Sequence, residues 1–173
     1  MVGHLVVVVG EDGEPLKTDS GDLKIIGRAG RSQRGEFASA YTCSRVLRRE
    51  SLDTLLESAG DGLVLSDRFT PMCASEAGEV VVLDDVMGAY RVHPSGVFSG
   101  ATATFRAKEQ LRSASIMLRR ARSSRQAVHT YWWASVWKAT KTSLRQRDLN
   151  LLRFVWQQVR VCRLGIGTSG WQG

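Results

Sequence analysis

The sequence lacks the features that mark disulfide-rich, zinc-binding or membrane-spanning proteins. It has three cysteines in 173 residues, Cys43, Cys73 and Cys162, and none belongs to a Cys-x-x-Cys pair. An odd number of widely spaced cysteines indicates neither a disulfide framework nor a zinc site, and suits a reducing cytoplasm. The apolar run from Leu5 to Val9 is too short for a signal peptide core, and no segment approaches the roughly 20 apolar residues of a membrane span. We therefore expect a cytoplasmic protein, either soluble or peripheral to a membrane.

Several catalytic motifs are missing as well. The chain contains no Gly-x-Ser-x-Gly, no Gly-x-x-x-x-Gly-Lys and no His-Glu-x-x-His. The common hydrolase, P-loop and zinc-protease chemistries therefore have no support. A hydrophobic content of 43% still places the chain in the globular class, and its length is enough for one well-cored domain.

Acidic residues are scarce in the second part of the chain. Residues 1–100 carry 10 Lys and Arg against 15 Asp and Glu, whereas residues 101–173 carry 14 against 2. This asymmetry is typical of a catalytic or binding domain joined to a basic segment that meets nucleic acid or the cytoplasmic leaflet of a membrane. The alternative is that the basic residues cover ordinary solvated helix faces.

The first part of the chain alternates apolar runs with turn residues. The β-branched residues of His4 to Val9 predict a strand, and the residues that follow, up to Pro15, have turn chemistry. We expect an exposed loop over Lys17 to Gly35, a short strand over Phe37 to Cys43, and a helix over Arg45 to Ala59 that Gly60 ends.

A second helix and strand follow. Ser66 is in place to cap a helix over Asp67 to Ala77, with Pro71 near its first turn and Gly78 at its end. The run from Glu79 to Leu83 predicts a strand, and Asp84 and Asp85 predict a structural turn after it.

The basic part of the chain has a helical pattern. We expect helices over Phe105 to Arg125 and Gln126 to Leu144, and a last helix that Asp148 caps and that runs through Leu164, before a flexible tail. Tryptophans with Arg and Lys beside them suit the headgroup region of a membrane, but they suit equally well the packing of helices on a domain; these are Trp132, Trp133, Trp137 and Trp156.

The order of residues from Ser66 to Gly100 resembles the closing half of family 2 glycosyltransferases with the GT-A fold. In that family an acidic residue opens a helix, a Gly ends it, and a strand leads to a Leu-Asp-Glu/Asp-Val turn and a Tyr-Arg-x-His segment. This chain has Ser66-Asp67, Gly78, Leu-Asp-Asp-Val and Tyr-Arg-Val-His in that order. The resemblance covers roughly Gly35 to Gly100, and His4 to Pro15 is similar, more weakly, to the strand and hairpin after the family's metal-binding Asp-x-Asp.

The resemblance implies roles for five residues. Asp67 would be the general base that accepts the proton of the acceptor hydroxyl, although it could equally share the capping of its helix with Ser66. His93 would bind a divalent metal, Mn²⁺ or Mg²⁺, or the donor diphosphate. Arg91, Ser95 and Ser99 would add donors for the diphosphate. The other two histidines, His4 and His129, are expected to be structural.

The resemblance therefore predicts an α/β fold, namely a partial GT-A (Rossmann-like) domain that lacks its nucleotide-binding half. Residues 1–100 would form its acceptor-side part, residues 101–164 a basic helical extension and residues 165–173 a tail. The reaction would transfer a sugar, with inversion, from a nucleotide-diphosphate sugar to a hydroxyl of a saccharide, a lipid-linked acceptor or a protein. Metal binding is expected only together with the missing Asp-x-Asp half. The alternative is a non-catalytic basic helical module that binds an anionic membrane surface or, less favoured, nucleic acid.

Overall fold

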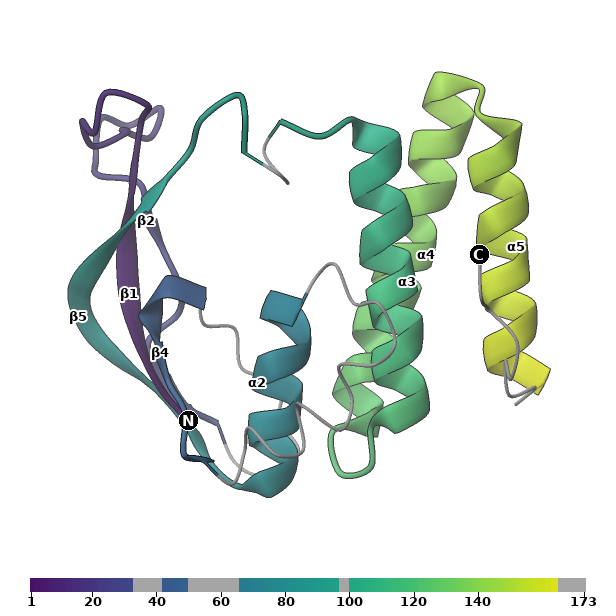
Figure 1. Cartoon of the computed structure of the whole chain (residues 1–173), viewed down its shortest axis with the longest axis horizontal. Helices are drawn as coiled ribbons and strands as arrows, with labels where there is room; N and C mark the ends of the chain where they lie inside the picture. The colour runs from purple at the N-terminus through teal and green to yellow at the C-terminus, as the bar shows by residue number, and fades with distance from the viewer. Residues whose placement is uncertain (33–41, 50–65, 97–99, 165–173) are drawn as a thin grey trace.

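The computed structural model describes residues 1–173 except 33–41, 50–65, 97–99 and 165–173. A curled five-stranded sheet faces four helices, so the chain has a mixed α/β fold (Figure 1). The helices lie on the concave side of the sheet, with α2 nearest to it and α5 furthest away.

The sheet is built around two long strands that run parallel to each other. Val2–Val9 (β1) pairs with Val80–Arg91 (β5). Two short strands, Ile25–Ile26 (β2) and Arg45–Val46 (β4), pair antiparallel with β1, and Gly30–Ser32 (β3) pairs antiparallel with β5. The predicted strand at His4 to Val9 is confirmed, and valines of both long strands are buried because β-branched side chains pack well on a pleated surface.

The segment predicted as a loop over Lys17 to Gly35 is more ordered than expected. It supplies β2 and β3, which satisfy backbone groups along the open edges of β1 and β5. The guanidinium of Arg31 also lies 3.1 Å from the carboxylate of Glu79. The loop prediction was wrong here because such short strands form by pairing with β1 and β5 and need no apolar period of their own.

Asp84 and Asp85 do not form the predicted turn, because β5 continues through them to Arg91. The pairing with β1 passes from His4↔Leu83 directly to Leu5↔Val86, so the two aspartates are extra residues in a β-bulge. Both side chains are exposed, which avoids the cost of burying a charge. A bulge bends its strand, and Figure 1 shows β5 strongly bowed.

The four long helices within the described residues were predicted, with differences at their ends. They are Ser66–Ala77 (α2), Ala103–Arg120 (α3), Arg125–Gln146 (α4) and Leu149–Leu164 (α5). The predicted cap at Asp148 is confirmed, since its carboxylate accepts the N–H of Leu151 at 3.0 Å. Pro71 lies in the second turn of α2 rather than near its first.

Two predictions between the first strand and α2 fall mostly on residues that lie outside the described ranges. Of the helix expected over Arg45 to Ala59, the first two residues belong to β4 instead, and residues 50–59 are not described. Of the strand expected over Phe37 to Cys43, residues 37–41 are not described, and Cys43 belongs to a 3₁₀ turn, Thr42–Ser44.

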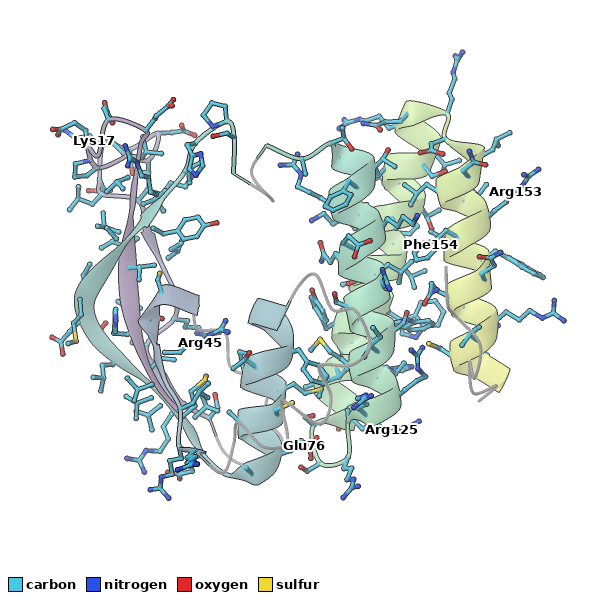
Figure 2. All side chains as sticks on the ribbon, viewed as in Figure 1. Lys17, Arg45, Glu76, Arg125, Arg153 and Phe154 are labelled. Atoms are coloured by element: carbon cyan, nitrogen blue, oxygen red, sulfur yellow. The ribbon has the colours of Figure 1, made fainter. Side chains whose placement is uncertain are left out.

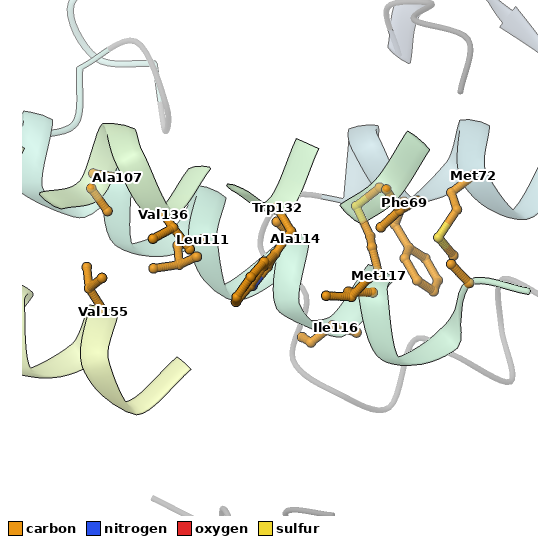
Figure 3. Close-up of a cluster of buried hydrophobic side chains, with 14 of the residues drawn as sticks. Phe69, Met72, Ala107, Leu111, Ala114, Ile116, Met117, Trp132, Val136 and Val155 are labelled. Carbon is orange, nitrogen blue, oxygen red and sulfur yellow. The ribbon is translucent and has the colours of Figure 1, made fainter. Parts of the chain in front are cut away.

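The main core lies among the helices. It joins Phe69 and Met72 of α2 to Leu111 and Met117 of α3 and to Trp132 of α4 (Figure 3). Burying side chains of this size contributes roughly 1.5–3 kcal/mol each. The core therefore continues across Gly100, the expected boundary between the acceptor-side part and the basic extension. Among the described residues, no helix is both long enough and apolar enough to cross a membrane.

Candidate functional site

The carboxyl ends of the two parallel strands form one edge of the sheet. Val9 pairs with Arg91, and the N–H of Val92 donates to the Val9 carbonyl at 3.0 Å. The guanidinium of Arg91 donates to the carbonyl of Glu11, in the turn after β1. Ligands of open α/β sheets bind at the carboxyl ends of the strands, so this edge is the candidate site.

His93 and Ser95 lie at this edge directly after β5. The Nδ1 atom of His93 is 2.9 Å from the hydroxyl oxygen of Ser95, and the N–H of Gly96 donates to the His93 carbonyl at 3.1 Å. Backbone also packs tightly here, because a Cβ atom on Gly100 would lie 2.0 Å from the carbonyl oxygen of Pro94. The tight turn thus carries an imidazole and a hydroxyl within four residues of Arg91.

Two of the predicted site residues are only partly placed. Asp67 is the second residue of α2, but its side chain lies outside the described part of the chain, and so does the whole of Ser99. Only Gly78 and Glu79 separate α2 from β5, and the helix and strand run in opposite directions (Figure 1). The start of α2 and the end of β5 therefore face the same direction, but the helix is much shorter than the strand and begins beside the middle of β5 (Figure 1).

The residues present do not by themselves fit a divalent metal ion. Among the residues that the structure describes, no three His, Cys, Asp or Glu side chains are grouped so that they could hold one. His93 supplies one nitrogen, whereas Mn²⁺ and Mg²⁺ prefer several oxygen ligands.

The remaining histidines have packing partners. The His4 ring lies over Gly88, where an added Cβ atom would be 3.0 Å from its Cε1 atom, and its Nδ1 is 2.8 Å from the Leu5 carbonyl oxygen. The His129 ring accepts the indole N–H of Trp133 at 3.1 Å. Both residues are thus engaged in local structure.

No family model, curated protein or solved structure matches the chain. The resemblance to family 2 glycosyltransferases therefore stays a prediction, resting on the pattern from Ser66 to Gly100.

Sequence reasoning missed the residue that holds α2 in place. The Glu76 carboxylate, near the end of α2, accepts N–H groups of Arg122, Ser123 and Ser124 and both serine hydroxyls (Figure 2). Burial acts to raise the pKa of Glu76, but these hydrogen bonds outweigh it and lower the pKa to about 2. The signal in the sequence was Ser123-Ser124 directly before a helix, although nothing there identified the distant partner.

Proposed function

We propose that this chain is the acceptor-side part of an inverting GT-A glycosyltransferase. The observation that supports the proposal is the arrangement of α2 and β5, which run in opposite directions with a two-residue connection. That arrangement directs the helix start with Asp67 and the strand end with Arg91 and His93 toward the same side. The same order of residues, Asp at a helix start and Tyr-Arg-x-His after a strand, carries the family resemblance.

The reaction would need few groups from this chain. The acceptor hydroxyl oxygen attacks the anomeric carbon of the sugar, the bond from that carbon to the diphosphate oxygen breaks, and the configuration inverts. Asp67 takes the hydroxyl proton, and a helix start keeps its carboxylate ionised because the helix dipole favours an anion there. The negative charge leaves with the nucleoside diphosphate.

The carboxyl ends of β1 and β5 would bind the negatively charged diphosphate as it leaves. A guanidinium has five N–H donors, so the bond from Arg91 to the Glu11 carbonyl leaves donor capacity for phosphate oxygens. The His93 ring and the Ser95 hydroxyl, which lie 2.9 Å from each other, follow directly after the strand that carries Arg91. The nucleoside itself would be bound by the other half of a GT-A domain, which we propose acts together with this chain.

The experiment compares Asp67→Asn with Asp85→Asn in the longest product of the gene. Release of nucleoside diphosphate is measured from a panel of nucleotide-diphosphate sugars, with saccharide and lipid-linked hydroxyl acceptors. Removing a general base should lower the transfer rate about 10²- to 10⁴-fold while donor binding stays unchanged. Asp85, exposed in the β-bulge, provides the matched control and should have no effect.

His93→Ala tests the other wall of the site. It should weaken donor binding while leaving the proton transfer at Asp67 intact, so that KM for the donor rises more than kcat falls. Turnover that survives Asp67→Asn would remove Asp67 from the role of base. No transfer from any donor in the panel would contradict the proposed function as a whole.

A further inference from the structure

The outer sides of α4 and α5 carry large apolar side chains that the protein leaves in solvent. Trp137 is 71% exposed and Trp156 is 64% exposed, whereas Trp132, about one turn before Trp137 on α4, is 2% exposed in the core. The α4–α5 face, as we call this surface, consists of Trp133, Trp137 and Leu144 on α4 and Leu149, Leu152 and Trp156 on α5.

The members of the face form one continuous surface. On α4, Trp133, Trp137 and Leu144 are spaced by four and seven residues, which places them on one side of a helix. The two helices are joined by a two-residue turn and lie antiparallel (Figure 1). The Arg163 guanidinium of α5 lies 5.8 Å from the centre of the Trp133 ring, so both rows border the same seam.

Cations surround these apolar side chains, and acids are nearly absent. From residue 125 to residue 164 the chain has eight Lys and Arg but one acid, Asp148, which is engaged as the cap of α5. Arg160 lies 5.4 Å from the centre of the Trp156 ring. Figure 2 shows Arg153 reaching outward from α5. The positive charge of the face is therefore not balanced by acidic residues of α4 and α5.

A pocket lies at one end of the seam. Its volume is about 540 Å³, and it is lined by Arg125, His129 and Arg163 together with apolar and polar neighbours, namely Leu118, Gln126, Trp132, Trp133 and Cys162. Guanidinium groups match phosphate oxygens in geometry as well as in charge. Trp133 and Arg163 belong to both the pocket and the seam.

We propose that the α4–α5 face docks on an anionic membrane surface, with the pocket taking a lipid phosphate. Indole rings are most stable at the level of the headgroups, and Arg side chains beside them reach the lipid phosphates. Exposed leucines favour a bilayer over nucleic acid, since Leu144, Leu149 and Leu152 offer a polynucleotide neither charge nor an aromatic stacking platform. The complementary charge of the leaflet makes the bilayer the occupant of this face.

This inference does not depend on transferase activity, since it uses only residues of α4 and α5 and the pocket between the helices.

Vesicle flotation with the full chain tests the proposal. Phosphatidylcholine vesicles with added phosphatidylglycerol should bind the chain, binding should weaken as salt is raised, and phosphatidylcholine alone should bind it poorly. The double variant Trp137→Ala/Trp156→Ala should weaken binding at least about 10-fold. Arg160→Gln/Arg163→Gln should weaken it by a similar factor.

Matched controls come from the sheet. Met87→Ala removes a side chain that is 64% exposed on β5, and Arg31→Gln removes an exposed cation of β3. Both should bind vesicles as the unchanged chain does. Circular dichroism checks that each variant folds. Lipids with brominated acyl chains provide a second measurement that needs no variant, because they should quench the tryptophan fluorescence of the bound chain.

Three results would overturn the proposal. One is no binding to anionic vesicles, or binding that the tryptophan and arginine variants leave unchanged. Another is tight binding of RNA or single-stranded DNA that the same variants abolish, without vesicle binding. The third is a dimer whose formation needs Trp137 and Trp156 while vesicles are not bound, since a second copy would then cover the face.

Discussion

The Glu76 carboxylate accepts the backbone N–H of Ser124 at 3.0 Å and its hydroxyl at 2.6 Å. An acid from the end of α2 thus satisfies the start of α4, where the helix dipole favours a negative charge. Ser124 itself makes no side-chain cap to α4, so the role that a local residue usually performs falls to a residue 48 positions earlier. This contact fixes α2 against the helical core.

Replacing Glu76 should destabilise the whole chain. Glu76→Ala leaves the donors of Arg122, Ser123 and Ser124 without their acceptor, and hydrogen bonds to a charged group contribute about 1.5–3 kcal/mol. We expect the free energy of unfolding, measured in urea, to fall by about 2–3 kcal/mol. Glu79→Gln breaks only the exposed ion pair with Arg31 and should cost less than about 1 kcal/mol. Equal effects of the two changes would contradict the capping role.

The same contact predicts how stability depends on pH. The pKa of Glu76 is lowered to about 2 in the folded chain, from an ordinary value of 4.5. The folded state therefore holds the proton less tightly than the unfolded state, and the stabilisation is complete above about pH 4.5. It should be lost progressively as the pH falls from about 4.5 toward 2. The measurement is the difference in unfolding free energy between the unchanged chain and Glu76→Gln, which should be constant near neutral pH and shrink through this window.

The helices could be predicted because each one carries its signals locally. Asp148 before α5 and the Gly78 that follows α2 are adjacent to the helices they delimit. The bulge in β5 could not be predicted, since Asp84 and Asp85 are turn residues by composition and only the register with β1 makes them extra residues in a strand. Likewise, no local signal shows that Glu76 contacts the start of α4, because its partners lie 46 to 48 residues later in the chain.

The candidate site was predictable in part for a similar reason. Arg91, His93 and Ser95 are close in sequence, so a strand end followed by a tight turn brings them to one edge. The bond from Arg91 to the Glu11 carbonyl joins segments 80 residues apart and has no local signal. The sequence could not decide between membrane contact and core packing for the tryptophans of α4 and α5. Their spacing alone does not show that Trp132 is buried while Trp137 is exposed.

That difference between two tryptophans gives a third prediction. The Trp132 indole N–H donates to the Ser115 hydroxyl at 3.0 Å within the core. Trp132→Phe removes this bond and leaves a small cavity, and should lower the free energy of unfolding by about 1–3 kcal/mol. Trp137→Phe changes an exposed ring and should stay within about 0.5 kcal/mol. Urea unfolding followed by circular dichroism compares the two, and a reversed order would contradict the assignment of inner and outer faces.

The cysteines should differ in reactivity according to their burial. Cys43 is exposed and Cys73 is buried, and burial raises the pKa of the Cys73 thiol from 9.0 to about 11. Burial also raises the pKa of Cys162. Because the thiolate is the reactive form, a shift of this size lowers its population at pH 8 about 100-fold, in addition to the steric protection.

We therefore expect a disulfide-exchange reagent to label one thiol of the native chain quickly, and Cys43→Ser to remove that fast phase. Labelling of Cys73 should require opening of the contact between α2 and α3, since its side chain belongs to the core that joins these helices. Glu76→Ala loosens α2 and so raises the equilibrium constant for opening, by about 30- to 150-fold for 2–3 kcal/mol. When opening and closing are faster than labelling, the labelling rate of Cys73 should increase by the same factor. A Cys73 rate that Glu76→Ala leaves unchanged would show that α2 opens without breaking its contact to α4.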